Sequence, residues 1–310
     1  MTSRVVVSLV VASLVWAASP AAADDDVIPG HTVDGPIDGA VQAVAIGAGL
    51  GFSLIPMREH TELWSNEMME LDRSVRDNFS RRAAHVSDAL LAGSIAAPVM
   101  YLTGSTIDDA DGDRLLIYAQ SMGINAALAQ GTKRLVQRPR PYMYSKDPVV
   151  RRYAKEHGDD GYLSFYSGHA ALSFGAAVTG AYLLGASSDN KLARGMSWGI
   201  GLMAASATAN LRVRAGKHFY SDVLIGAAIG TAVGYVVPAL HADARPYVPS
   251  GQEIAAAACG IIAGVMVSQL IPLEKKRDED GTTRSSPISR INLSPVPMPD
   301  GIGFAIGGAM

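Results

Sequence analysis

Long apolar segments alternate with short polar ones along most of the chain. Seven of them are rich in Ala, Gly, Val, Ile and Leu, and each is longer than the roughly 3–10 residues of an ordinary strand. They cover about residues 38–57, 85–104, 115–131, 169–186, 195–211, 219–240 and 252–271. The pattern predicts an all-α fold, a bundle of six to seven apolar helices.

The pattern is compatible with two environments for these helices, a membrane and water. Segments 219–240 and 252–271 are nearly free of charge and reach the length of about 20 residues that a bilayer requires. Several others are interrupted by Gly, Ser and Thr, and the mean hydropathy of +0.17 is low for a protein with many spans. A soluble bundle with buried apolar helices is therefore the alternative, but we expect association with a membrane.

The beginning of the chain has the order of an export signal. Arg4 supplies a positive charge, the run from Val5 to Trp16 is apolar, and three alanines end at Ala23 before Asp24. This order is typical of a secretory signal peptide, here residues 1–23, and indicates a bacterial cell envelope. The remainder is expected to comprise a polar linker (24–37), one helical domain (38–271) and a C-terminal tail (272–310).

Composition excludes several functions, and the end of the chain has the pattern of a short β element. A net charge of −3 gives no indication of nucleic-acid binding. The single cysteine, Cys259, excludes a disulfide within the chain and a cysteine metal cluster. In the tail, two short apolar runs flank a Pro-Asp-Gly turn at 299–301, which predicts a β-hairpin.

Three polar islands interrupt the apolar pattern, at residues 133–141, 166–169 and 212–222. The first closes the third apolar segment, the second opens the fourth, and the third opens the sixth. Antiparallel neighbours in a bundle then bring all three islands to the same end. The islands contain two histidines, one carboxylate and several permanent cations, a combination suited to binding an oxyanion.

The cations and the helix start in these islands fit a phosphoryl group. Arg140 and Arg212 carry planar guanidinium groups that suit bidentate contacts with phosphate oxygens, and Lys133 adds a point charge. The backbone N–H groups that follow Gly168 open a helix, and a helix N-terminus binds anions. Ser167 stands at the N-cap position, so its hydroxyl binds either the backbone or the substrate. We expect these five residues to bind phosphate.

The two histidines and the carboxylate supply the reactive groups. His218 and Asp222 are four residues apart at the start of a helix and so share a face. An aspartate that accepts a hydrogen bond from one ring nitrogen leaves the other nitrogen free to attack phosphorus. We therefore expect His218 to be the nucleophile, Asp222 to orient it, and His169 to protonate the leaving oxygen and later activate water.

The spacing of the three islands resembles the signature of the type 2 phosphatidic acid phosphatase superfamily, which includes bacterial acid phosphatases and vanadium haloperoxidases. That signature reads K-x6-R-P, P-S-G-H and S-R-x5-H-x3-D, and here it falls on Lys133, Arg140-Pro141, Ser167-Gly168-His169, Arg212, His218 and Asp222. Two positions depart from it: Tyr166 replaces a proline and Leu211 replaces a serine. The resemblance implies a helical phosphatase that uses a phosphohistidine and no metal or other cofactor.

Other functions remain open at this point. Two histidines and an aspartate are good metal ligands, but the adjacent cations would repel a divalent ion. The substrate is expected to be a lipid phosphate of the phosphatidic acid or prenyl pyrophosphate type. Alternatives are a soluble periplasmic acid phosphatase, a vanadium haloperoxidase, and an inactive phosphate-binding protein that has lost the two signature residues.

Residues that flank the islands are further candidates for substrate contact. These are Arg138, Arg214, Lys217 and His157. The polar stretch 142–166 is expected to form a loop over the site that selects the leaving group. The acidic stretch 105–114 lacks the glutamate of a calcium-binding loop and is expected to be a solvated connection.

The side of the membrane on which the site lies poses a conflict. If the signal is removed and all seven segments span, three crossings place the first island in the cytoplasm, and the Lys and Arg of the polar loops agree. The family resemblance implies the outer face of the inner membrane instead. We therefore expect that not every segment spans, and that the site faces the periplasm.

Overall fold

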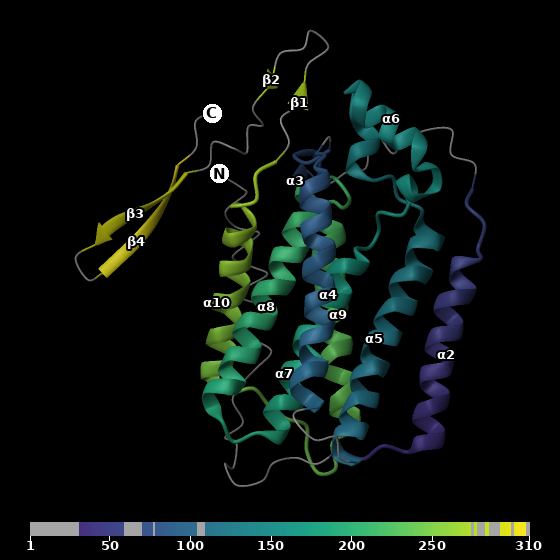
Figure 1. Cartoon of the computed structure of the whole chain (residues 1–310), viewed down its shortest axis with the longest axis vertical. Coiled ribbons are helices and arrows are strands. Elements are labelled where there is room, and N and C mark those ends of the chain that lie inside the picture. Colours follow the sequence, from purple (N-terminus) through teal and green to yellow (C-terminus); the bar gives the residue numbers. More distant parts are fainter. Residues whose placement is uncertain are drawn as a thin grey trace.

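The protein is a bundle of long helices with a short helical cap and a β-hairpin (Figure 1). The computed structural model describes residues 31–58, 70–76, 78–103 and 109–273 and four short strands beyond them. The helices are α2 (Gly35–Ser53), α3 (Glu70–Arg73), α4 (Arg81–Thr103), α5 (Asp109–Val136), α6 (Pro148–Glu156), α7 (Gly168–Ser187), α8 (Lys191–Arg214), α9 (Tyr220–Leu240) and α10 (Gly251–Ser268). The 3₁₀ helices η1 (Pro141–Tyr144) and η2 (Gly158–Tyr162) flank α6.

The apolar segments expected from the sequence are the seven long helices, and the all-α bundle is confirmed. Among the described residues, four helices are long and apolar enough to cross a membrane by length and composition: α4, α7, α9 and α10. The signal peptide expected at residues 1–23 lies outside the described residues.

Helix α7 forms the centre of the bundle. Its side chains are buried along nearly its whole length, and it packs against α4, α5, α8 and α9. The contact with α9 is close because Gly226, Gly230 and Gly234 face it, and a Cβ at any of them would collide with the α7 backbone. Small residues four apart allow such close approach of two helices. This contact fixes the start of α9 against the start of α7, where the second and third polar islands lie.

The tail forms the predicted hairpin. Strands β3 (Asn292–Met298) and β4 (Gly301–Gly307) pair antiparallel, with Met298 opposite Gly301. A shorter antiparallel pair, β1 (Lys276–Arg277) and β2 (Thr283–Arg284), precedes it.

Two expectations about the connections were wrong. Helix α5 begins at Asp109, so residues 109–114 of the acidic stretch expected to be a loop are helical. The stretch 142–166 contains α6, because Asp147 caps the N–H groups of Val149 and Val150 and Pro148 stands at the first helical position. This helix lies at the same end of the bundle as the three polar islands (Figure 1).

Candidate active site

The predicted site residues lie at helix ends, at one end of the bundle. Lys133 is in the last turn of α5, Ser167 caps α7, Arg212 is in the last turn of α8, and Asp222 is in the first turn of α9. His218 lies in the connection from α8 to α9, and its near neighbours in charge are Arg140, Arg212, Lys133 and His169. The fold therefore brings together all of the expected site residues.

The imidazole of His218 is completely buried, and its two nitrogens differ. Nδ1 donates to the backbone carbonyl of Ser164 at 2.7 Å. Nε2 has no hydrogen-bond partner among the described residues. An Nδ1–H held by a carbonyl fixes the tautomer that leaves a lone pair on Nε2. The ring therefore presents Nε2 as a free nucleophile.

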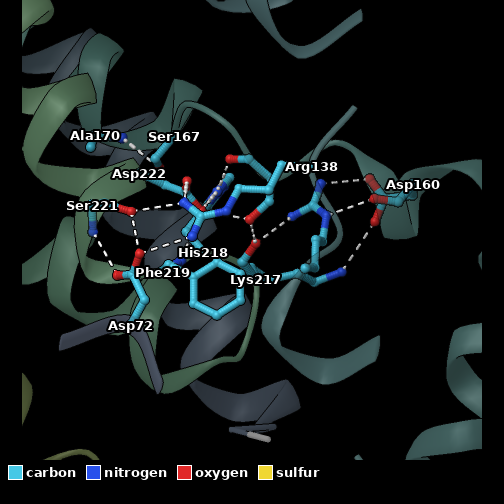
Figure 2. A network of polar contacts seen from close by, with 12 residues as sticks. Asp72, Arg138, Asp160, Ser167, Ala170, Lys217, His218, Phe219, Ser221 and Asp222 are labelled. Carbon is cyan, nitrogen blue, oxygen red and sulfur yellow. Dashed lines mark hydrogen bonds and ion pairs between the residues drawn. The ribbon is translucent and has the colours of Figure 1, made fainter. Parts of the chain in front are cut away.

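Asp222 does not orient His218 by the direct hydrogen bond that we expected. Its Oδ2 lies 3.8 Å from Nδ1 of His218, too far for a hydrogen bond. Oδ2 instead accepts from the Ser164 hydroxyl at 2.6 Å. It also accepts from the Phe219 N–H at 2.8 Å (Figure 2). Because α9 begins directly after Phe219, the carboxylate of Asp222 caps this helix. Its hydrogen-bonded connection to His218 runs through Ser164.

Arg138 joins Asp222 to a second buried carboxylate. Its NH1 lies 2.6 Å from Oδ1 of Asp222, and its NH2 lies 2.8 Å from Oδ2 of Asp72. Asp72 also accepts from the N–H and the hydroxyl of Ser221 (Figure 2). The guanidinium rests over the ring of Phe219 at 4.3 Å. Arg138 thus holds the start of α9. Removal of one partner from a buried ion cluster of this kind is strongly destabilising.

The two arginines expected to bind phosphate are buried and partly occupied. Arg140 donates through NH2 to Oδ1 of Asp160 at 2.7 Å and through Nε to the Asp160 carbonyl. Its NH1 donates to the Lys217 carbonyl at 3.2 Å, so three of its five N–H groups are used. Arg212 donates through NH1 to Oδ1 of Asp88 at 2.9 Å, while its buried Nε has no hydrogen-bond partner among the described residues. Each guanidinium therefore keeps donor capacity for an anion.

The start of α7 has the geometry of an anion site beside Lys133. The Ser167 hydroxyl accepts from the Ala170 N–H at 3.3 Å, so it caps the helix. A Cβ on Gly168 would stand 3.2 Å from Nζ of Lys133, so glycine leaves room for the ammonium. The described residues supply no hydrogen-bonding partner for this ammonium.

The crowding of cations changes the ionisation of the site. Burial, followed by the charges of Arg140 and Arg212, lowers the pKa of Lys133 to about 7. The same three causes lower the pKa of His218 well below its ordinary value, so the ring is neutral near pH 7. Burial and Arg140 also lower the pKa of Lys217 to about 8. A site with this excess of positive charge favours an anion and an unprotonated His218.

The match to a known family agrees with this geometry. Residues 114–246 match the family model of the PAP2 superfamily. This stretch is a PAP2 superfamily domain. Searches of curated proteins and of solved structures found no match. The matched residues include every expected site residue, together with all of α7, α8 and α9 and most of α5.

The four flanking candidates have partners within the protein. Those of Arg138 are given above, and those of the other three follow. Arg214 donates to the carbonyls of Ser268 and Ile271 and so closes the end of α10. Lys217 bonds the Tyr153 hydroxyl at 2.7 Å. His157 stacks on the same tyrosine.

A cleft of about 480 Å³ opens beside the PAP2 site. Its walls come from the start of α4, from α6 and from the end of α8, and they mix polar and apolar surface. The lining residues include Arg81, His85, Asp88, Glu156, Arg212 and Lys217. The cleft therefore reaches Arg212, one of the two arginines expected to bind phosphate.

Several residues of the PAP2 site were missed by sequence reasoning. Asp72 and Asp88 stand outside the signature, on α3 and α4, and nothing in the local pattern marks them. Asp160 and Ser164 lie in the stretch expected to overhang the site, which was the only indication of their role. In the described part of the chain no group of three His, Cys, Asp or Glu side chains is arranged to hold a metal ion.

Proposed function

We propose that the protein is a metal-independent phosphatase that cleaves phosphomonoesters or pyrophosphates through a phosphohistidine on Nε2 of His218. The observation that supports this most strongly is the state of that ring. It is neutral, its Nδ1–H is held by the Ser164 carbonyl, and its Nε2 is unpartnered within a group of cations. A neutral imidazole carries the lone pair that attacks phosphorus, and the surrounding cations attract the phosphate.

In the first step the phosphoryl group binds to the three cations and the start of α7. Lys133, Arg140 and Arg212 neutralise its oxygens, since phosphoryl transfer depends mainly on positioning and charge stabilisation. Nε2 of His218 forms a bond to phosphorus as the bond to the leaving oxygen breaks. His169 gives a proton to that oxygen.

In the second step water hydrolyses the intermediate. His169, now without its transferred proton, takes a proton from water, and the hydroxide attacks phosphorus. The P–N bond breaks, and its electron pair returns to Nε2 of His218. Inorganic phosphate leaves, and the site is restored.

The apolar surface of the bundle supports a lipid substrate. Large side chains on α2, α9 and α10 are strongly exposed, among them Leu50, Leu240 and Ile262. Exposed apolar surface on several helices favours contact with a membrane or a partner. We therefore propose an inner-membrane enzyme of the bacterial envelope, with its site on the periplasmic side, that acts on a lipid phosphate such as phosphatidic acid or a prenyl pyrophosphate.

A soluble periplasmic phosphatase of broad specificity is the second candidate. The observation that favours it is the polar wall of the cleft, where His85, Asp88 and Glu156 would meet the leaving group. A hydrophilic leaving group suits such a wall better than a hydrocarbon chain does.

The test is phosphate release by the purified full chain in detergent with EDTA present. The substrates are phosphatidic acid, a prenyl pyrophosphate and 4-nitrophenyl phosphate. The variant His218→Ala is compared with His241→Gln, whose imidazole bonds Asp38 at the far end of the bundle. We expect release from the lipids that falls by about 10³ or more in His218→Ala and persists in His241→Gln.

The other outcomes are equally informative. Release mainly from 4-nitrophenyl phosphate would favour the soluble phosphatase. Bromide oxidation that appears only with added vanadate would favour a haloperoxidase. No turnover, with phosphate binding retained in His218→Ala, would show a binding protein and overturn the proposal.

A further inference from the structure

One carboxylate outside the signature contacts two predicted site residues at once. Oδ1 of Asp88 lies 2.8 Å from Nε2 of His169 and 2.9 Å from NH1 of Arg212. The three residues come from three helices, since Asp88 is on α4, His169 on α7 and Arg212 on α8. Helix α4 packs against both of the others. A single oxygen therefore joins the expected proton donor to an expected phosphate ligand.

We propose that Asp88 is a positioning residue for proton transfer, which orients the imidazole of His169 toward the leaving oxygen. This inference rests on the proposed phosphatase activity and adds a residue to it. An ordinary surface ion pair between long exposed side chains has little effect. Here the partners are different, because Arg212 is buried and His169 is mostly buried, so their positions are fixed by the bundle.

The contact determines which proton His169 can transfer. A carboxylate can only accept, so the Nε2–H of His169 is held by Asp88. The proton that passes to the leaving oxygen is then the one on Nδ1. After transfer the ring is neutral, with Nδ1 free to take a proton from the attacking water. The Nε2–H remains on Asp88 in both steps, which keeps the ring in one orientation.

Arg212 explains why the carboxylate stays in place. Its NH1 donates to Oδ1 of Asp88 and also to the Ser87 hydroxyl at 3.2 Å. Ser87 is fully buried, so it anchors the guanidinium beside the start of α4. The side chain of Asp88 is about half exposed to the cleft, at 54%. It thus lies at the boundary between the buried cations and the cleft.

The test uses the dependence on leaving-group basicity. An alkyl phosphate needs a proton on its leaving oxygen, whereas 4-nitrophenolate leaves without one. We expect Asp88→Asn to reduce kcat on the alkyl phosphate by roughly tenfold or more, within the roughly 10²–10⁴-fold that a general acid contributes. On 4-nitrophenyl phosphate we expect a reduction of less than about threefold. A purely structural role would reduce both equally.

The matched control is Asp189→Asn, which changes an exposed aspartate in the connection from α7 to α8, at the other end of the bundle. It should leave both rates within about twofold. In a His169→Gln background, Asp88→Asn should have no further effect that depends on the leaving group, because contacting residues are coupled. Equal losses on both substrates, or no loss on either, would overturn the role of Asp88. If the wild type releases phosphate from neither substrate, the proposed phosphatase itself fails.

Discussion

The Nδ1 atom of His218 donates to the backbone carbonyl of Ser164 at 2.7 Å. A carbonyl accepts a hydrogen bond but cannot take up a proton under these conditions. The ring is therefore oriented without a proton relay, and Nε2 is left free. The Ser164 hydroxyl donates to Asp222, which connects this orientation to the start of α9.

Loss of Asp222 should destabilise the fold as well as the site. Asp222→Ala leaves Arg138 buried with one carboxylate instead of two and removes the cap on Phe219. Breaking a buried pair costs about 3–5 kcal/mol, and we expect the lower end because Asp72 remains. Chemical denaturation in detergent would measure this. Asp147→Ala, which removes the exposed cap of α6, should cost about 1 kcal/mol. Equal losses in the two variants would contradict the ion cluster.

A methyl group at Gly168 should interfere with phosphate binding. The Cβ of Gly168→Ala would stand 3.2 Å from Nζ of Lys133, so the ammonium must move. Loss of one charge-assisted hydrogen bond costs about 1.5–3 kcal/mol, which corresponds to a rise in KM of roughly tenfold or more. Steady-state kinetics on 4-nitrophenyl phosphate would show it. An unchanged KM would mean that Lys133 does not bind the substrate.

The affinity for substrate should fall as the pH rises above neutral. Lys133 lies in the last turn of α5, outside the four candidate spans, and its pKa is lowered to about 7. Because the charged form exists below that pKa, the ammonium is lost between about pH 7 and pH 9. A phosphate ester is already a dianion there, its second pKa being about 6. We expect KM to rise roughly tenfold across this interval.

The control for this pH dependence is Lys133→Gln, which has no ionisable group at that position. Its KM should be high at pH 7 and change little up to pH 9. A rise as steep as that of the wild type would assign the pH dependence to another group. Lys217 is the candidate, because its pKa is lowered to about 8.

A side chain at Gly216 should destabilise the connection that carries His218. Gly216 has φ of +71°, and a Cβ would collide with the carbonyl oxygen of Asn78. Gly216→Ala combines backbone strain of about 1–3 kcal/mol with that collision. Thermal unfolding should show a lower Tm. Gly251→Ala, at a helix start where a Cβ meets nothing within 4 Å, is the control. The same Tm for both variants would contradict the tight turn.

Membrane insertion should resist treatment that removes peripheral proteins. If α4, α7, α9 and α10 span a bilayer, the full chain stays with the membranes after extraction with alkaline carbonate. Helices of this length and hydropathy match the thickness of the hydrocarbon core. Recovery of the chain in the supernatant without detergent would support the soluble candidate instead.

The sequence by itself determined the helices and the end of the bundle at which the site lies. An apolar run of about 20 residues is a local property of the sequence, so the seven long helices could be predicted one by one. The signature residues Lys133, Arg212 and His218 also follow local rules, because each stands where an apolar segment begins or ends. Antiparallel packing of neighbours then places them together. Even the short terminal hairpin follows from its turn.

Only the tertiary structure decided how these residues are partnered. Asp222 is four residues from His218, which favoured a direct contact, but the cap on Phe219 draws its carboxylate toward the helix start. Asp72 and Asp88 come from α3 and α4, far from the signature in sequence, so no local pattern could pair them with Arg138 and Arg212. Pairing across helices depends on packing and on which buried charge needs a partner. Those are properties of the whole bundle.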